Sequence, residues 1–285
     1  MDNFKTLYRL YKQYAKMDFL WLLRDTKYCL MQIFSDAVCA FCTIAGVYLL
    51  SVRFGGLGGM TQEEILFMMS YATIVEGIYM MFFIGCNTGM VSRIIGRGQL
   101  DHTVIQPVPL WIQLLAQGFS PFSGSTILIG GIGLSLYSIG NMSLAVTPGW
   151  IFLLVLYSIS STLIIVAVIY ILSCMAFYAP AAAEEIAGVG KDLFSSLKTY
   201  PLGGMGKSAG TILLTVLPIG LTAWYPSKLL LMVGTEGVTW NQALEFLYLP
   251  AMTLILVMIA LLLFKKGMKY YARCGSPRYS GFGHR

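Results

Sequence analysis

The sequence predicts an all-α polytopic membrane protein with six transmembrane helices, both termini in the cytoplasm and an amphipathic interfacial helix at the N-terminus. Three observations predict this fold. Of the 285 residues, 57% are hydrophobic and only 11% are charged, whereas a soluble domain carries about a quarter charged residues. Apolar runs recur at the length of roughly 20 residues that a spanning helix needs. Lys and Arg also gather in alternate connections between these runs.

Residues 1–27 are predicted to form a cytoplasmic helix that lies on the inner membrane surface. Apolar and aromatic side chains follow one helical stripe and basic side chains follow another, a segregation typical of an interfacial helix. The first stripe comprises Phe4, Leu7, Tyr8, Tyr11 and Tyr14, and the second comprises Lys5, Arg9, Lys12 and Lys16. A signal peptide fits poorly, because the polar lead is long and no small-residue cleavage site follows the apolar run.

Six apolar runs lie within residues 28–264, the predicted six-helix transmembrane domain. They extend from about Cys29 to Leu50, Ile65 to Gly89, Leu110 to Ile139, Trp150 to Tyr178, Ala209 to Trp224, and Phe246 to Phe264. Pro218 interrupts the fifth run. Six crossings place both chain ends on the same side, and residues 265–285 form a basic cytoplasmic tail.

The distribution of positive charge predicts which side is cytoplasmic. Seventeen of the 19 Lys and Arg residues fall at the ends and in the second-to-third and fourth-to-fifth connections, the last of which holds Lys191, Lys198 and Lys207. The opposite side holds only Arg53 and Lys228. Because short cytoplasmic segments collect Lys and Arg, this asymmetry predicts cytoplasmic termini. It also accounts for the net charge of +6 without nucleic acid, although a basic RNA-binding tail is a remote alternative.

Two acidic residues lie inside predicted spans. Asp36 shares a helix face with Thr43, and Glu76 shares one with Thr73 and Asn87. A carboxylate in hydrocarbon costs at least a few kcal/mol, so both faces are expected to turn towards protein or water. Asp36, Thr73, Glu76 and Asn87 are therefore candidates for the lining of a substrate path, with a purely structural role for the two acids left open.

Small residues predict close helix contacts, and cysteines predict little chemistry. Gly130, Gly131 and Gly133 cluster in the third run, where missing side chains let helices approach. Cys39 and Cys42 have no nearby His or second cysteine pair, so no metal site is predicted.

The connection 91–109 carries the most distinctive pattern. It contains a short basic helix, a break at Gly96 and Gly98, a polar turn and an apolar re-entry before Pro109. The order of an Ile-rich helix, Gly-x-Leu-Asp, a hydrophobic pair and a proline resembles the permease subunits of type-2 ABC (ABC-2) exporters. The matching residues are Ile94, Ile95, Gly98, Leu100, Asp101, Val104, Ile105 and Pro107.

The resemblance extends over most of the chain. It includes the basic amphipathic lead, the six spans, Tyr200-Pro201, Pro218, Tyr225-Pro226 and the segment from Gly267 to Tyr271. In that family the second-to-third connection is the coupling helix that docks on the ATPase subunit. The resemblance implies this role for Arg93, Ile94, Ile95, Gly96, Arg97, Gly98, Leu100 and Asp101.

The resemblance also implies the function and the partners. The chain would be the non-catalytic permease subunit of an exporter in a bacterial plasma membrane. It would form the translocation pathway with a second permease chain, identical or homologous. A separate ABC ATPase would use ATP and Mg²⁺, so this chain would bind no cofactor itself.

The stretch from Pro201 to Ser208, PLGGMGKS, nearly spells a phosphate-binding loop. Proline stands at the first glycine position, no strand pattern precedes it, and no acidic strand end offers a magnesium ligand. The stretch is therefore interpreted as a glycine-rich lead into the fifth span, with Lys207 anchored at the inner interface.

Two other function classes agree less well with the sequence. An ion-gradient-driven secondary transporter would use Asp36 or Glu76 as its coupling site, but no internal repeat is evident. An intramembrane enzyme fits less well, because His102 and His284 are both predicted outside the bilayer.

Overall fold

The computed structural model describes residues 2–84, 91–122, 124–142, 144–237 and 243–275. The regular elements in these ranges are helices. Four of them are long and apolar enough to cross a membrane, at Thr26–Phe54, Gln62–Phe83, Pro148–Phe177 and Leu244–Cys274. The predicted all-α membrane class is thereby confirmed.

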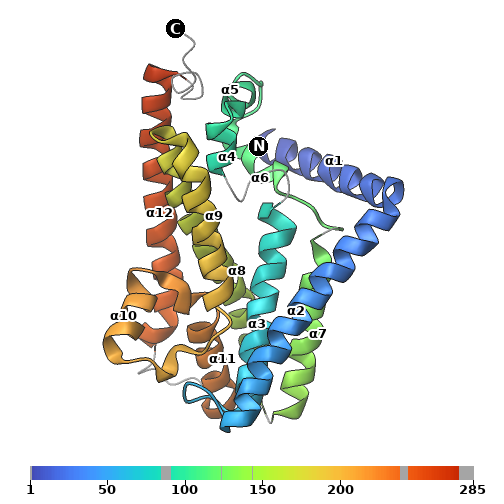
Figure 1. Cartoon of the computed structure of the whole chain (residues 1–285), viewed down its shortest axis with the longest axis vertical. Coiled ribbons are helices and arrows are strands. Elements are labelled where there is room, and N and C mark those ends of the chain that lie inside the picture. The colour runs from blue at the N-terminus through green and yellow to red at the C-terminus, as the bar shows by residue number, and fades with distance from the viewer. Residues whose placement is uncertain (1, 85–90, 123, 143, 238–242, 276–285) are drawn as a thin grey trace.

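The N-terminal helix is separate from the first span. Helix α1 (Asp2–Arg24) lies crosswise to the long helices, and the chain turns at Asp25 into α2 (Thr26–Phe54) (Figure 1). Asp18 accepts a hydrogen bond from the Phe122 N–H at 2.7 Å, and Tyr11 packs on Phe119 with ring centroids 4.7 Å apart. These contacts attach α1 to the segment that follows α6 (Leu110–Gln117).

Helix α3 forms the centre of the bundle. A capping box starts α3 (Gln62–Tyr79), because the Glu64 carboxylate accepts the Thr61 N–H at 2.8 Å while Thr61 accepts the Glu64 N–H. A π-helical turn, η1 (Met80–Ile84), extends it. Buried side chains of α3 pack with those of α8 (Pro148–Ser173), α11 (Trp224–Glu236) and α12 (Ala243–Cys274) in the main core.

Helix α7 (Ser125–Asn141) packs directly against α3 (Figure 1). A Cβ on Gly77 would lie 2.4 Å from the Leu128 Cα, and one on Gly131 would lie 2.8 Å from the Ile74 nitrogen. The predicted contact at Gly131 is therefore confirmed, whereas a Cβ on Gly130 or Gly133 would meet nothing within 4 Å.

The third apolar run forms two helices instead of one. It divides into α6 and α7, and Pro121 lies in the break between them, where its missing N–H cannot continue a helix. The Ser120 N–H donates instead to the Met81 carbonyl of η1 at 2.8 Å. The π-helical turn thus holds the break in place.

The fifth apolar run does not form a long helix. Residues 207–236 contain α10 (Lys207–Thr215), the 3-10 turn η5 (Pro218–Leu221) and α11, and the predicted interruption at Pro218 is confirmed. The 18-residue helix α9 (Pro180–Leu197), which follows the 3-10 turn η3 (Cys174–Phe177), was predicted as a cytoplasmic connection.

The position of Pro201 corrects this prediction. The chain passes along the bundle from the start of α9 to the turn η4 (Leu202–Gly204) (Figure 1). At the start of α9, Pro180 lies close to Gly96 of α4 (Val91–Gly96). A Cβ on Gly58, in the connection between α2 and α3, would lie 2.9 Å from the Pro201 carbonyl oxygen. The prediction that placed Lys198, Pro201 and Lys207 at the same end as residues 91–109 is therefore wrong. The four charged residues of α9 lower its mean hydropathy, so the hydropathy pattern did not predict this passage.

Candidate functional site

The predicted coupling segment forms two short helices at one end of the bundle (Figure 1). These are α4 and α5 (Gln99–Val104), each of 6 residues. Gly98 separates them with a φ of 70°, a left-handed conformation that a residue with a side chain rarely adopts. The segment therefore turns back on itself between α3 and α6.

The apolar residues of the segment are buried in their own subunit. Ile94, Ile95 and Leu100 are 3%, 0% and 0% exposed and belong to the inner cluster. The inner cluster comprises Val91, Ile94, Ile95, Leu100, Leu114, Cys174, Ala176, Phe177, Ala183 and Tyr271. Ile94, Ile95 and Leu100 therefore anchor the segment on η3, α9 and α12, and they are not available to a docking partner.

Polar contacts bind the segment to the same helices. The Arg93 Nε and Arg97 Nη2 atoms lie 2.7 and 3.2 Å from Oε1 of Glu184, in the second turn of α9. The Tyr271 hydroxyl of α12 donates to Oδ1 of Asp101 at 2.6 Å. Displacement of α4 or α5 must therefore displace α9 and α12 or break these contacts.

The outer surface of the segment is exposed and partly apolar. Val104 and Ile105, here called the α5 tip, are 49% and 81% exposed, and the Arg97 side chain is 58% exposed. Large apolar side chains at this exposure, next to a charged rim, are typical of a surface that binds another protein.

A cavity of about 450 Å³ lies between α2, α3 and the end of α9. Asp36, Thr73 and Glu76 line it, so three of the four predicted path residues share one space. The fourth, Asn87, lies outside the described residues. The helical spacing predicted that both acids face protein or water, and their position in the lining of this cavity is consistent with that prediction.

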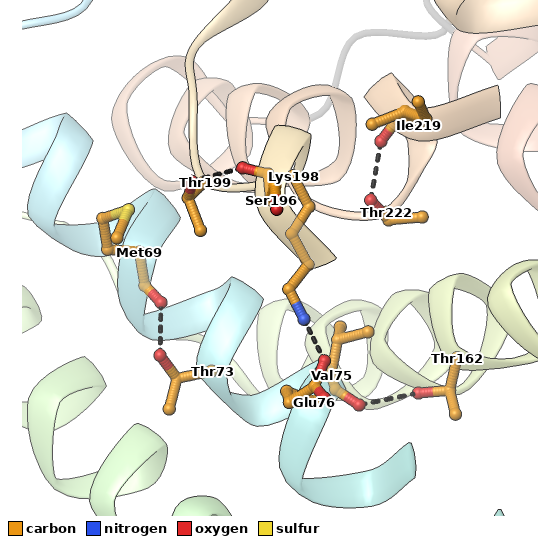
Figure 2. A network of polar contacts seen from close by, with 10 residues as sticks. All are labelled: Met69, Thr73, Val75, Glu76, Thr162, Ser196, Lys198, Thr199, Ile219 and Thr222. Atoms are coloured by element: carbon orange, nitrogen blue, oxygen red, sulfur yellow. Dashed lines mark hydrogen bonds and ion pairs between the residues drawn. The ribbon is translucent and has the colours of Figure 1, made fainter. Parts of the chain in front are cut away.

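An ion pair joins α3 to the end of α9 in this cavity. Figure 2 shows the Lys198 ammonium pointing at the Glu76 carboxylate. The two side chains are only 6% and 17% exposed. Nearby, Thr162 of α8 donates to the Val75 carbonyl at 3.4 Å, so α3, α8 and α9 meet here through polar contacts.

Sequence reasoning missed three residues that complete these contacts, namely Glu184, Lys198 and Tyr271. Lys198 was counted among cytoplasmic charges, although its position right after an amphipathic stretch was a usable signal. Glu184 carried no local signal, because its arginine partners lie 91 and 87 residues away. Tyr271 entered the sequence analysis only as the last residue of a segment that resembles the family.

A second cavity, of about 550 Å³, lies between α6, α8 and α12. Its lining is apolar apart from the Tyr170 hydroxyl and the Trp111 ring nitrogen. It therefore offers no charged group to a ligand.

The PLGGMGKS stretch is not arranged as a phosphate loop. Residues 202–204 form the 3-10 turn η4, and α10 starts at Lys207. A Cβ on Gly203 would lie 2.1 Å from the Gly58 carbonyl oxygen, so this glycine serves close packing against the α2–α3 connection.

Comparison with protein families identifies the chain. Residues 37–275 match the model of the ABC-2 family transporter protein. The chain belongs to the ABC-2 transporter family. The match begins within α2, one residue after Asp36, and continues past the end of α12. The α4–α5 segment of this ABC-2 membrane protein lies inside it, as do the cavity-lining residues other than Asp36. Comparisons with curated proteins and with solved structures give no match.

Proposed function

We propose that the chain is the permease subunit of an ATP-driven exporter, that two permease units form the translocation pathway, and that an ABC ATPase docks on the α4–α5 segment. The observation that carries the proposal is the exposed α5 tip on a segment whose other face is bound to α9 and α12. Family membership supports an ATPase partner in general.

The docking contacts are assigned to exposed groups. Within the predicted coupling set, Arg97 reaches the surface, while Ile94, Ile95 and Leu100 give the segment its shape. Val104 and Ile105 of the α5 tip would fill an apolar depression on the ATPase, with Arg97 at the rim. Arg93 and Asp101 would transmit movement through Glu184 and Tyr271.

The membrane arrangement is proposed as six crossings with both termini in the cytoplasm of a bacterial cell. The four long apolar helices, the α6–α7 pair and the passage from α9 to η4 supply them. The common position of α1 and the end of α12 at the α4–α5 end supports this count (Figure 1). The fifth crossing thus precedes the apolar run first assigned to it.

The energy source is proposed to lie outside this chain. ATP and Mg²⁺ would bind the partner, and ATP would favour the state in which the two ATPases are closed. The movement would pass from α4 through Glu184 to α9, and from Lys198 to Glu76 in the cavity. Packed and ion-paired contacts of this kind form a continuous physical route between docking site and cavity.

Co-purification with the candidate ATPase tests the proposal. We expect the wild-type pair to hydrolyse ATP and the Ile105→Asp variant to lose at least about tenfold in affinity, because a charge at the centre of an apolar contact leaves it desolvated and unpaired. Leu244→Asp is the matched control, since Leu244 is 82% exposed and Ile105 is 81% exposed. Equal ATPase binding by both variants would remove the α5 tip from the docking surface.

A further inference from the structure

The charges of the Asp36 cavity do not balance. Glu76 and Lys198 neutralise each other through their ion pair. Asp36 faces the same space from α2, and no cation of the described residues lies within ion-pair distance of it. The cavity therefore presents one net negative charge in a part of the molecule that lies among membrane helices.

The threonines among the neutral polar groups of the cavity add acceptors. Each of its three threonines donates its hydroxyl proton to a backbone carbonyl of its own segment: Thr43 to Cys39 at 2.9 Å, Thr73 to Met69 at 2.8 Å, and Thr199 to Ser196 at 2.7 Å. A hydroxyl that donates in this way keeps its oxygen lone pairs for a ligand. The Lys198 ammonium, a strong donor, is already engaged by Glu76. A ligand that donates hydrogen bonds suits this lining.

The remaining lining is mostly apolar, and Ser195, Ser196 and Tyr200 add hydroxyl groups to it. Ile44, Met69, Met80 and Ile127 contribute to the wall of the cavity. Methionine side chains adapt to irregular ligand shapes because they are unbranched and polarisable. The cavity thus combines one carboxylate outside the ion pair with a flexible apolar wall, the arrangement that a molecule with a cationic head and an apolar body would fill.

We propose that Asp36 binds the ammonium group of an amphipathic amine in this cavity, and that, given the proposed export function, such amines are the transported class. The cation would supply the counter-charge that the described residues do not offer Asp36, which offsets the cost of a carboxylate among membrane helices. Glu76 and Lys198 form the adjoining wall and stay paired.

Equilibrium binding to the purified chain in phosphatidylglycerol nanodiscs tests the site without any ATPase. The probe is dansylcadaverine, a fluorescent primary amine, and its N-acetyl derivative lacks the charge. We expect saturable binding of the amine above protein-free nanodiscs, and affinity at least about tenfold weaker for the acetylated probe, since a hydrogen bond to a charged group is worth about 1.5–3 kcal/mol. Equal affinity of wild type for the two probes would overturn the proposal.

Variants then locate the charge. Asp36→Asn should weaken dansylcadaverine binding by the same factor, and Asp36→Glu should retain it because the carboxylate is kept. Asp192→Asn is the matched control, because Asp192 is an exposed residue of α9 that does not line the cavity. Unchanged affinity in a folded Asp36→Asn variant, or an equal loss in Asp192→Asn, would contradict the assignment.

Competition distinguishes two sources of the amine. Dihexanoyl phosphatidylethanolamine should displace the probe if the site takes a lipid headgroup, and dihexanoyl phosphatidylglycerol should not displace it. Resistance to both lipids assigns the site to free amphipathic amines. Because these measurements need no ATPase, amine binding with no ATPase association would refute the proposed function alone, and ATPase association with no amine binding would refute this inference alone.

Discussion

At the residue scale, the Glu76–Lys198 contact is the polar contact of the described residues whose loss should destabilise the membrane domain most. Both side chains are largely buried, so each partner is the main compensation for the other's desolvation. Removal of one partner leaves an uncompensated charge, whereas removal of both leaves two neutral groups and no unpaired charge.

We therefore expect Glu76→Gln or Lys198→Met to destabilise the protein by about 3–5 kcal/mol, the range found when one member of a buried pair is removed. The double variant should recover most of that loss. Thermal unfolding of the purified protein in detergent, analysed as a double-mutant cycle, measures the coupling. Additive losses in the double variant would show that the two residues stabilise the fold independently.

Helical spacing in the sequence predicted that the face of Asp36 and the face of Thr73 and Glu76 each turn towards protein or water, but it did not predict that they line one cavity. It could not supply the cation, because Lys198 comes from a distant helix and no local pattern pairs it with Glu76. The sequence also could not predict that Ile94, Ile95 and Leu100 are buried in their own subunit. A short apolar segment has the same sequence pattern whether it packs on its own subunit or on a partner.

At the element scale, α9 connects the two candidate functional regions, the α4–α5 segment and the Asp36 cavity. Glu184 near its start contacts Arg93 and Arg97, and Lys198 directly after its end contacts Glu76. An 18-residue helix is about 27 Å long, so α9 can carry a displacement over that distance with little internal change.

Replacement of Glu184 by Gln tests this connection. We expect the ATPase to remain bound, because the α5 tip is untouched, while the stimulation of ATP hydrolysis by a transported amine falls at least several-fold. Glu185→Gln is the neighbouring control, since Glu185 is exposed and outside the ion-pair set. Normal stimulation in the Glu184 variant would mean that α9 does not transmit the movement.

Element boundaries were predictable where backbone chemistry set them. Thr61 and Thr147 cap the starts of α3 and α8, and Pro218 breaks the fifth apolar run. The passage through α9 was not predictable from mean hydropathy, because Glu184, Lys191 and its other charged residues lower the apolar signal. The charge of Glu184 is tolerated since Arg93, elsewhere in the fold, pairs with it.

At the scale of the whole molecule, the packing of Gly58 against Pro201 and Gly203 revises the topology. Residues 91–109 and residues 201–204 belong to opposite ends of the bundle (Figure 1). With the termini in the cytoplasm, PLGGMGKS would face the outside of the cell, where a nucleotide-binding role is untenable.

Single cysteines introduced into a cysteine-free background test this orientation. Met205 is 45% exposed, and Met205→Cys should react with a membrane-impermeant maleimide added to intact cells. His102→Cys, at an exposed position of α5, should react only after the cells are opened. The reverse labelling pattern would invert the orientation, and protection of both positions in intact cells would restore the cytoplasmic placement of Met205.

Family membership and the residue contacts together favour ATP-driven transport over ion coupling. The sequence pattern of residues 91–109 indicated the ABC-2 family, and the family match confirms it. Glu76, one of the two acids considered for ion coupling, is paired with Lys198. The three-dimensional shape of the cavity depended on how α2, α3 and α9 pack, which hydropathy alone does not encode.

The Glu76–Lys198 contact also has a consequence for biogenesis. The two residues are 122 positions apart, so α3 leaves the ribosome and enters the bilayer long before its counter-charge exists. Until α9 has inserted, the nascent chain carries a lone carboxylate among membrane helices, a state that lipid penalises. Closure of the pair thus marks the insertion of α9, and a chain truncated before α9 stays distinguishable from a finished one to any protease that surveys the bilayer.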